Sequence, residues 1–190
     1  DVEYQILDAE ADDWLDVVPL VDPARDSFDV SGMTGKNDWK IVGRDLVYTA
    51  DGLAGKMLFP LELGGREFEW EIEFTRQSGR AGFTTDVPAN GGPIPVAVGG
   101  DGADPVALGA SGIKLDLPTG IETGKRVTLK VRVERVGVED RISVFLDGRP
   151  AGTWTGDREE IVKKVFEGYP SAQRTGLFVM RGGSYAFHAV

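Results

Sequence analysis

The chain has 190 residues, a formal net charge of −10, one histidine and no cysteine. Its length suits a single domain and its 41% of hydrophobic residues can fill a core, but no apolar run approaches the roughly 18–20 residues of a membrane span. The lack of cysteine excludes disulfides, cysteine-bound metals and thiol catalysis, and a single histidine, His188, disfavours histidine metal sites and Ser-His-Asp hydrolysis.

The negative charge is concentrated at the start of the chain. Residues 1–16 contain seven of the 31 acids and no base, so 24 acids and 21 bases remain elsewhere, a net charge of −3. We therefore expect residues 1–16 to be an acidic lead-in segment and residues 17–190 to be one domain. Because the chain begins at Asp1, we also expect it to be part of a longer protein. The overall charge argues against nucleic acid and against insertion into anionic membranes.

Alternating apolar and polar residues predict strands along the first half of the chain. The clearest case is residues 67–74, Glu-Phe-Glu-Trp-Glu-Ile-Glu-Phe, which places acids on one face of a strand and apolar residues on the other. Residues 86–112, rich in Gly, Pro and Ala, are expected to form long loops around one short strand. The shorter strands expected in this half are Trp39–Val42, Asp45–Thr49, Met57–Leu61, Ala81–Thr84, Val96–Val98 and Gly112–Leu115.

The second half predicts further strands and one helix. The Asp147-Gly148 pair predicts a type I′ hairpin turn, because these residues tolerate positive φ. A capping box at Asp157 and Glu160, followed by an apolar stripe, predicts a short helix that ends at Gly168. The strands expected here are Val127–Val133, Ile142–Leu146, Thr153–Trp154, Gly176–Arg181 and Tyr185–Ala189. Together these elements predict an all-β, two-sheet antiparallel jelly-roll β-sandwich with one short helix.

The order of these elements resembles a known family. The pattern runs from Trp39 and Asp51-Gly52 through the Phe68–Phe74 strand to Ile142–Gly148, and closes with Gly176-Leu177-Phe178 and Phe187. It resembles the concanavalin A-like lectin/glucanase jelly roll in its laminin-G-like form, from about Trp14 to the end. It is particularly similar to the 3-keto-disaccharide hydrolase-type domain of secreted planctomycete and Bacteroidetes proteins. The resemblance implies an extracytoplasmic module of a larger bacterial protein.

The residues that the hydrolase-type domains carry are only partly present. Those domains usually have Asn-Ser-Gly-Ile and then an Arg after the strand that resembles Phe68–Phe74. Residues 77–85 are Gln-Ser-Gly-Arg-Ala-Gly-Phe-Thr-Thr, which keep Ser-Gly but lack the Asn and the following Arg. This departure favours a binding module over an enzyme. Related modules also occur in membrane-anchored protein kinases, so a spacer or sensor domain is a further alternative.

The candidate catalytic residues are Glu69, Glu71 and Glu73. Their i, i+2 spacing places them about 7 Å apart on one face, and glycosidases use carboxyl pairs about 5–9.5 Å apart. The row weakly resembles the Glu-x-Asp-x-Glu strand of laminarinase-type glucanases, with Glu71 in place of the Asp. The alternative is a solvent-facing row whose acids pair with basic residues on neighbouring strands, namely Lys130, Arg132 and Arg141.

Candidate ligand-binding residues are Trp154, Tyr169 and Arg80. The two aromatic residues flank the predicted helix and could stack on sugar rings or pack that helix onto a sheet, and Arg80 follows Ser78-Gly79. Trp70, in contrast, alternates with apolar neighbours and is expected in the core. Asp101 and Asp104 lie in a Gly-rich stretch and are a candidate calcium pair, the only cofactor that the sequence suggests.

Three functions stay open from the sequence. The first is a non-catalytic recognition module that binds carbohydrate or a surface partner. The second is a glycoside-cleaving enzyme of the 3-keto-disaccharide hydrolase or glucanase type that uses the face of Glu69, Glu71 and Glu73. The third is a structural spacer or sensor domain without a sugar ligand.

Overall fold

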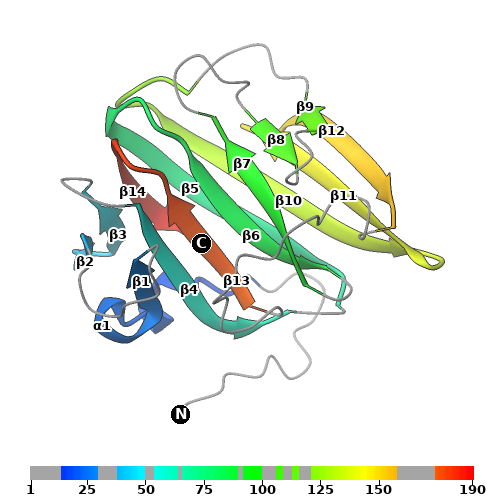
Figure 1. Cartoon of the computed structure of the whole chain (residues 1–190), viewed down its shortest axis with the longest axis horizontal. Helices are drawn as coiled ribbons and strands as arrows, with labels where there is room; N and C mark the ends of the chain where they lie inside the picture. The colour runs from blue at the N-terminus through cyan, green and yellow to red at the C-terminus, as the bar shows by residue number, and fades with distance from the viewer. Residues whose placement is uncertain are drawn as a thin grey trace.

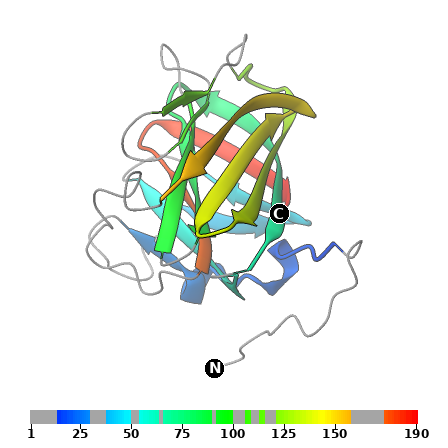
Figure 2. The ribbon, with the colours of Figure 1, turned by 90° about the vertical axis from the view of Figure 1, so that its right-hand side faces the viewer.

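The computed structural model describes residues 14–29, 38–49, 54–63, 66–89, 92–99, 106–108, 113–115, 121–157 and 174–190. Within these residues the strands form two seven-stranded antiparallel sheets that pack as two layers (Figures 1 and 2). Sheet I has the order β1 (Ser27–Asp29), β4 (Gly55–Glu62), β13 (Arg174–Val179), β6 (Phe83–Ala89), β7 (Gly92–Val98), β8 (Val106–Leu108) and β9 (Ile113–Leu115). Sheet II has the order β12 (Arg149–Gly156), β11 (Glu139–Leu146), β10 (Arg126–Val136), β5 (Phe68–Gly79), β14 (Gly183–Ala189), β3 (Asp45–Tyr48) and β2 (Trp39–Val42). The predicted two-sheet β-sandwich is confirmed.

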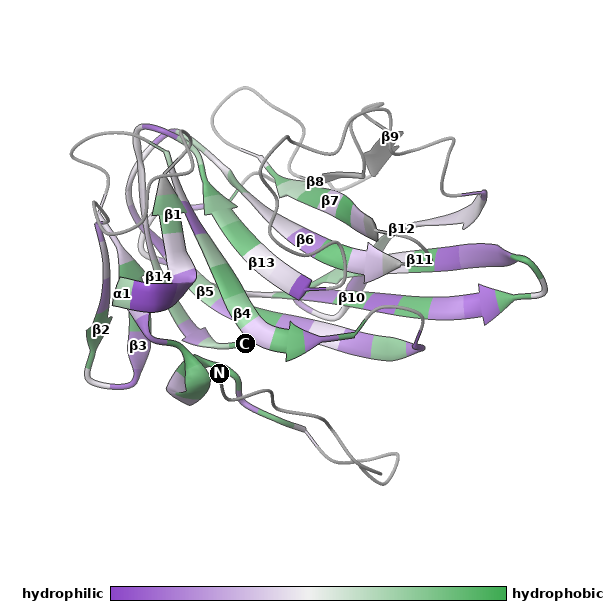
Figure 3. Ribbon diagram, turned by 60° about the horizontal axis from the view of Figure 1, so that its bottom comes forward, coloured by the Kyte–Doolittle hydropathy of each residue, from purple (hydrophilic) through white to green (hydrophobic). Residues whose placement is uncertain are grey.

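The core lies between the two sheets and follows the alternation seen in the sequence. Hydrophobic and hydrophilic residues alternate along the strands of sheet II (Figure 3). Trp70, Ile72 and Phe74 of β5 are almost fully buried, so the expectation that Trp70 belongs to the core is confirmed. The Trp70 indole Nε1–H donates a 3.0 Å hydrogen bond to Thr85 Oγ1 on β6. This bond connects the two sheets through the core and satisfies the one polar atom of the buried ring.

The hairpin between β11 and β12 forms as the sequence predicts. Asp147 and Gly148 have φ of 49° and 73°, and Leu146 pairs with Arg149 across the turn. Two consecutive positive φ values are the signature of the predicted type I′ turn. The following strand is longer than Thr153–Trp154, because β12 runs over Arg149–Gly156.

The expectation of loops around one short strand is wrong for residues 86–95, while the predicted strand Val96–Val98 is confirmed as the end of a longer strand. Strand β6 continues to Ala89, β7 begins at Gly92, and β8 adds a further short strand. The prolines of this region obscured the pattern, because a proline cannot donate a ladder hydrogen bond. Within β7, Val96–Val98 pair with β8 on one side and with β6 on the other. Pro93 and Pro95 lie outside this segment and have β6 as their one described neighbouring strand. Proline is tolerated at such positions.

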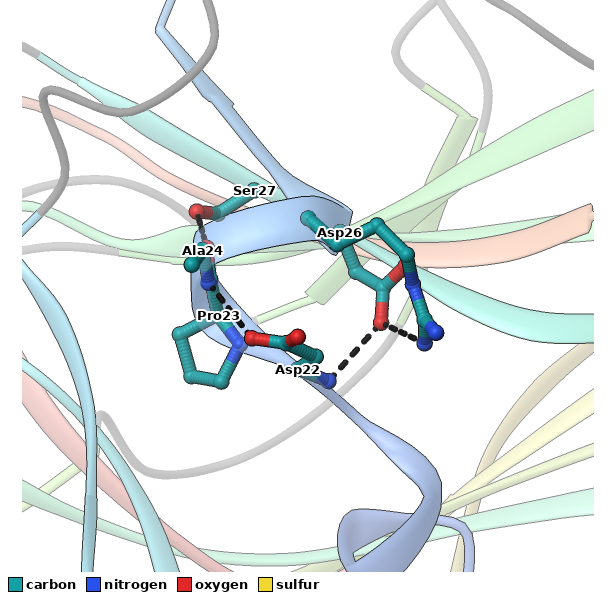
Figure 4. A network of polar contacts seen from close by, with 6 residues as sticks. Asp22, Pro23, Ala24, Asp26 and Ser27 are labelled. Carbon is teal, nitrogen blue, oxygen red and sulfur yellow. Dashed lines mark hydrogen bonds and ion pairs between the residues drawn. The ribbon is translucent and has the colours of Figure 1, made fainter. Parts of the chain in front are cut away.

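A short helix, α1 (Pro23–Asp26), precedes β1 and follows a 3₁₀ turn at Val18–Leu20. Asp22 caps α1 by accepting a 3.0 Å hydrogen bond from the Ala24 N–H, and Asp26 accepts one of 2.8 Å from the Asp22 N–H (Figure 4). This helix could not be predicted from the sequence, because four residues carry no helical periodicity. The helix predicted after Asp157 lies outside the described residues. No helix in the described part of the chain is long and apolar enough to cross a membrane.

Candidate functional site

The glutamate row of β5 lies on the outer face of sheet II, because Glu69, Glu71 and Glu73 alternate with the buried Trp70 and Ile72. Each glutamate forms an ion pair with a base of β10. The Lys130 Nζ lies 3.2 Å from both Glu69 Oε2 and Glu71 Oε2, Arg132 pairs with Glu69, and the Arg126 Nε lies 3.1 Å from Glu73 Oε1.

These contacts confirm the predicted pairing with Lys130 and Arg132. The predicted pairing with Arg141 is wrong, because β10 lies between β11 and β5. Arg141 is instead in register with Glu134 of β10.

The ion pairs keep Glu69, which contacts both Lys130 and Arg132, in its ionised form. Partial burial raises the pKa of Glu69, but hydrogen bonds and charges from Arg132 and Lys130 outweigh it and hold this pKa below the usual range. Burial lowers the pKa of Lys130, yet Glu71 and Glu69 raise it above its usual value. A glycosidase needs one carboxyl with a raised pKa as its general acid, and Glu69 has the opposite shift.

The lowered pKa of Glu69 gives a measurable pH dependence. We expect Glu69→Gln to lower the free energy of unfolding at pH 7 by about 1 kcal/mol, because the pair is partly exposed. A lowered pKa stabilises the fold above the ordinary glutamate pKa, and this stabilisation disappears as the pH falls through the shifted value. Urea unfolding at pH 7 and pH 3 should therefore show a difference between wild type and Glu69→Gln that shrinks at the lower pH. A difference that is independent of pH would contradict this assignment.

The proposed ligand residues Trp154 and Arg80 lie far apart. Trp154 is in register with Ile142, and its half-buried ring packs against the core at the Phe68 end of β5. The exposed Arg80 directly follows Gly79 at the other end of β5, roughly 40 Å from Phe68 along the strand. The two residues therefore do not form one site. A ligand role for either one stays a prediction.

The remaining predicted site residues, Tyr169, Asp101 and Asp104, lie outside the described residues. Among the residues that the structure describes, no group of three or more His, Asp or Glu side chains gathers to hold a metal ion. His188 lies on β14, where its Nε2 is 2.9 Å from Thr75 Oγ1 and its Nδ1 is 3.1 Å from Asp45 Oδ1. These contacts join β14 to its two neighbouring strands, β5 and β3.

A second polar cluster, which the sequence patterns did not predict, lies on the outer face of sheet I. The Lys56 Nζ on β4 lies 3.2 Å from the Asp86 Oδ2 on β6. Their side chains are only 16% and 12% exposed, although both alternate with core residues and therefore point away from the core. Burial lowers the pKa of Lys56, and the charge and hydrogen bond of Asp86 offset part of this shift. An ion pair that is shielded from solvent, with a lysine whose pKa is lowered by burial, is a candidate for a functional site.

Strand register explains how these two side chains meet. Strand β13 lies between β4 and β6, with Phe178 in register with Lys56 and Gly176 in register with Asp86. Because Gly176 has no side chain, the lysine can extend diagonally across β13 to the carboxylate. Phe28 of β1 is in register with Lys56 on its other side.

Five outward-facing residues therefore form what we call the Lys56–Asp86 patch. Phe28 and Phe178 supply two half-buried rings. Thr84, which is buried, is in register with Phe178. The members of the patch are Phe28, Lys56, Thr84, Asp86 and Phe178.

The sequence carried one weak signal for this patch. The run Met57-Leu58-Phe59-Pro60-Leu61 is continuously apolar, which is typical of a strand shielded on both faces. Leu58 is only 1% exposed and yet lies outside the core cluster between the sheets. A lysine that directly precedes such a run is a candidate for an enclosed charge.

The sequence matches no family model and no curated protein. Several solved structures share its architecture. A winged bean acidic lectin complexed with methyl-alpha-D-galactose has a TM-score of 0.53 and 11% identity, over 86% of this chain and 95% of the lectin. The VIP36 exoplasmic/lumenal domain in its Ca²⁺/Man-bound form has a TM-score of 0.57 and 9% identity, over 86% and 80%.

A legume lectin-like domain from Entamoeba histolytica has a TM-score of 0.54 and 11% identity, over 95% of this chain and 97% of that domain. At such low identities, structural similarity establishes the fold and does not fix the function. The chain has the concanavalin A-like, legume lectin-like β-sandwich fold.

Proposed function

We propose that this chain is a non-catalytic recognition module that binds carbohydrate at the Lys56–Asp86 patch. The shielded ion pair is the observation that carries the proposal. Sugar hydroxyls both donate and accept hydrogen bonds, so the Asp86 carboxylate and the Lys56 ammonium can bind neighbouring hydroxyls of one ring. The half-buried Phe28 and Phe178 flank Lys56 and offer apolar surface to the C–H face of a sugar.

The similar structures support sugar as the class of ligand. One is a lectin complexed with methyl-alpha-D-galactose, and another contains Ca²⁺ and Man. We extend the proposal to an extracytoplasmic module of a larger bacterial protein, with Asp101 and Asp104 as candidate calcium ligands. Calcium is therefore a variable of the binding experiment.

Isothermal titration calorimetry against a panel of mono- and oligosaccharides, with and without calcium, tests the proposal. We expect at least one saccharide to bind, and both Asp86→Asn and Lys56→Met to weaken this binding by about tenfold or more, because each change removes one of the two charged groups that are proposed to contact the sugar hydroxyls. The matched control is Glu73→Gln, an ion-paired carboxylate on the outer face of the other sheet. We expect this control to bind as the wild type does.

Two results would contradict the proposal. One is that no saccharide of the panel binds, in which case a spacer, a sensor domain or a protein-binding module would be the remaining functions. The other is unchanged affinity in folded Asp86→Asn and Lys56→Met variants, which would move the site away from the patch.

A glycoside-cleaving activity is the second candidate, and the same panel detects it. New reducing ends or 3-keto products would assign catalysis to the face of Glu69, Glu71 and Glu73. The ion pairs of all three glutamates with β10, and the lowered pKa of Glu69, favour the non-catalytic proposal. From the resemblance to the 3-keto-disaccharide hydrolase type we therefore propose a sugar as the ligand, and we do not propose the hydrolase reaction.

A further inference from the structure

The outer face of sheet II carries an acidic row and a basic row on adjacent strands. The acidic row on β5 consists of Glu69, Glu71 and Glu73, and the basic row on β10 consists of Arg126, Lys130 and Arg132. In the antiparallel register, Lys130 lies beside Glu71 and Arg132 lies beside Glu69. The six side chains are between 27% and 57% exposed. Their oxygens and N–H groups can therefore also meet a second surface.

We infer that this face is a contact surface between two copies of the chain. The two rows make it self-complementary about a two-fold axis that runs parallel to the strands, between β5 and β10. Rotation about this axis places the acidic row of one copy over the basic row of the other copy. Each residue keeps its position along the strand direction. Lys130 of each copy then faces Glu71 of the other copy, and Arg132 faces Glu69. An axis perpendicular to the strands would place like charges opposite each other.

Trp14 provides an apolar anchor at the centre of the same face. Its ring is 61% exposed and its centroid lies 5.1 Å from the Lys130 Nζ, and the adjacent Leu15 is 46% exposed. On the side of β10 away from β5, the Arg132 Cζ lies 6.0 Å from the centroid of the Phe145 ring of β11. Interfaces between proteins are enriched in tryptophan and arginine and are surrounded by a polar rim. An exposed tryptophan beside the two-fold axis, within complementary charge rows, has this composition.

The inference does not depend on the proposed sugar site. The contact uses sheet II, whereas the Lys56–Asp86 patch lies on the outer face of sheet I. A dimer formed in this way presents the two patches on opposite outer sides. The dimer would therefore be bivalent for any ligand that binds the patch.

Charge reversal at one facing pair tests the contact directly. We expect sedimentation velocity to show the wild-type chain as a dimer that dissociates on dilution and in high salt. Glu71→Lys alone places two lysines opposite each other, and Lys130→Glu alone places two glutamates opposite each other, so each variant should be monomeric. An equimolar mixture of Glu71→Lys and Lys130→Glu should form the dimer again, because every facing pair in the mixed dimer is attractive.

Two further variants and a measurement of folding separate a loss of the contact from a loss of the fold. Trp14→Ala should also shift the chain toward the monomer, whereas Val138→Ala should not, because this 92% exposed valine lies at the β10–β11 turn and outside the two rows. Circular dichroism melting of each variant shows that the fold is retained. A wild type that is monomeric at every accessible concentration would overturn the inference. So would a dimer that survives both single charge reversals and Trp14→Ala.

Discussion

Trp70→Ala is expected to lower the free energy of unfolding by about 3–5 kcal/mol, the range for removing a large aromatic side chain from a core. Trp70 is 4% exposed, and its ring centroid lies 5.4 Å from that of Phe59 on the opposite sheet. The substitution leaves a cavity between the sheets and removes the hydrogen bond that Thr85 accepts. Urea denaturation followed by circular dichroism measures the loss.

The matched control is the same substitution at the exposed Trp14, measured at low protein concentration. Trp14→Ala should change the free energy of unfolding by no more than about 0.5 kcal/mol, because surface substitutions rarely cost more. Similar losses for the two variants would show that the assignment of core and surface on sheet II is wrong. Trp70→Phe should recover part of the loss, since it retains most of the apolar contact.

Gly79→Ala is expected to destabilise the fold by about 3 kcal/mol, which combines the cost of a left-handed backbone with that of a backbone clash. Gly79 ends β5 with φ of +82°, and a Cβ at this position would lie 2.0 Å from the carbonyl oxygen of Gly182. The neighbouring strand cannot move away easily, because the Arg80 N–H donates a 3.2 Å hydrogen bond to the same oxygen.

Gly137→Ala is the control for Gly79→Ala. Gly137 has a similar φ of +67°, but no atom lies within 4 Å of a Cβ built there. Its substitution should cost about 1 kcal/mol, the backbone contribution alone. Thermal melts of both variants separate the two contributions, and equal losses would contradict the clash. The Ser-Gly pair at residues 78–79 thus has a structural reason to be present that is independent of any catalytic role.

Elements with a strict period of two were predictable from the sequence. Strands β5 and β10 alternate apolar and charged residues, so both their existence and their outward-facing charges could be predicted. The Asp147-Gly148 turn could be predicted because two adjacent positive φ values select those residue types. The prolines of β6 and β7 hid how far these two strands extend beyond the predicted Ala81–Thr84 and Val96–Val98. Whether a proline is tolerated there depends on which neighbouring strand pairs with it, which is a property of the sheet and not of the local sequence.

The candidate site was not predictable, for a topological reason. Lys56 and Asp86 are 30 positions apart in the sequence, and they meet across β13, a strand contributed by residues 174–179. Gly176, which has no side chain, is the residue of β13 in register with Asp86. No local pattern encodes an arrangement of three strands from three parts of the chain. The members of the glutamate row, in contrast, are two positions apart in the sequence, so a local pattern reveals them.

The measurement that tests the sugar-binding proposal most directly is an NMR titration of the chain with a saccharide that binds in calorimetry. Aromatic, lysine and backbone amide resonances report the site in one experiment. The proposal predicts shift changes at Lys56, Asp86 and Phe178 on sheet I, and none beyond noise at Glu69, Glu71 and Glu73 on sheet II. Shift changes confined to the glutamate row, with the Lys56–Asp86 patch unaffected, would contradict it.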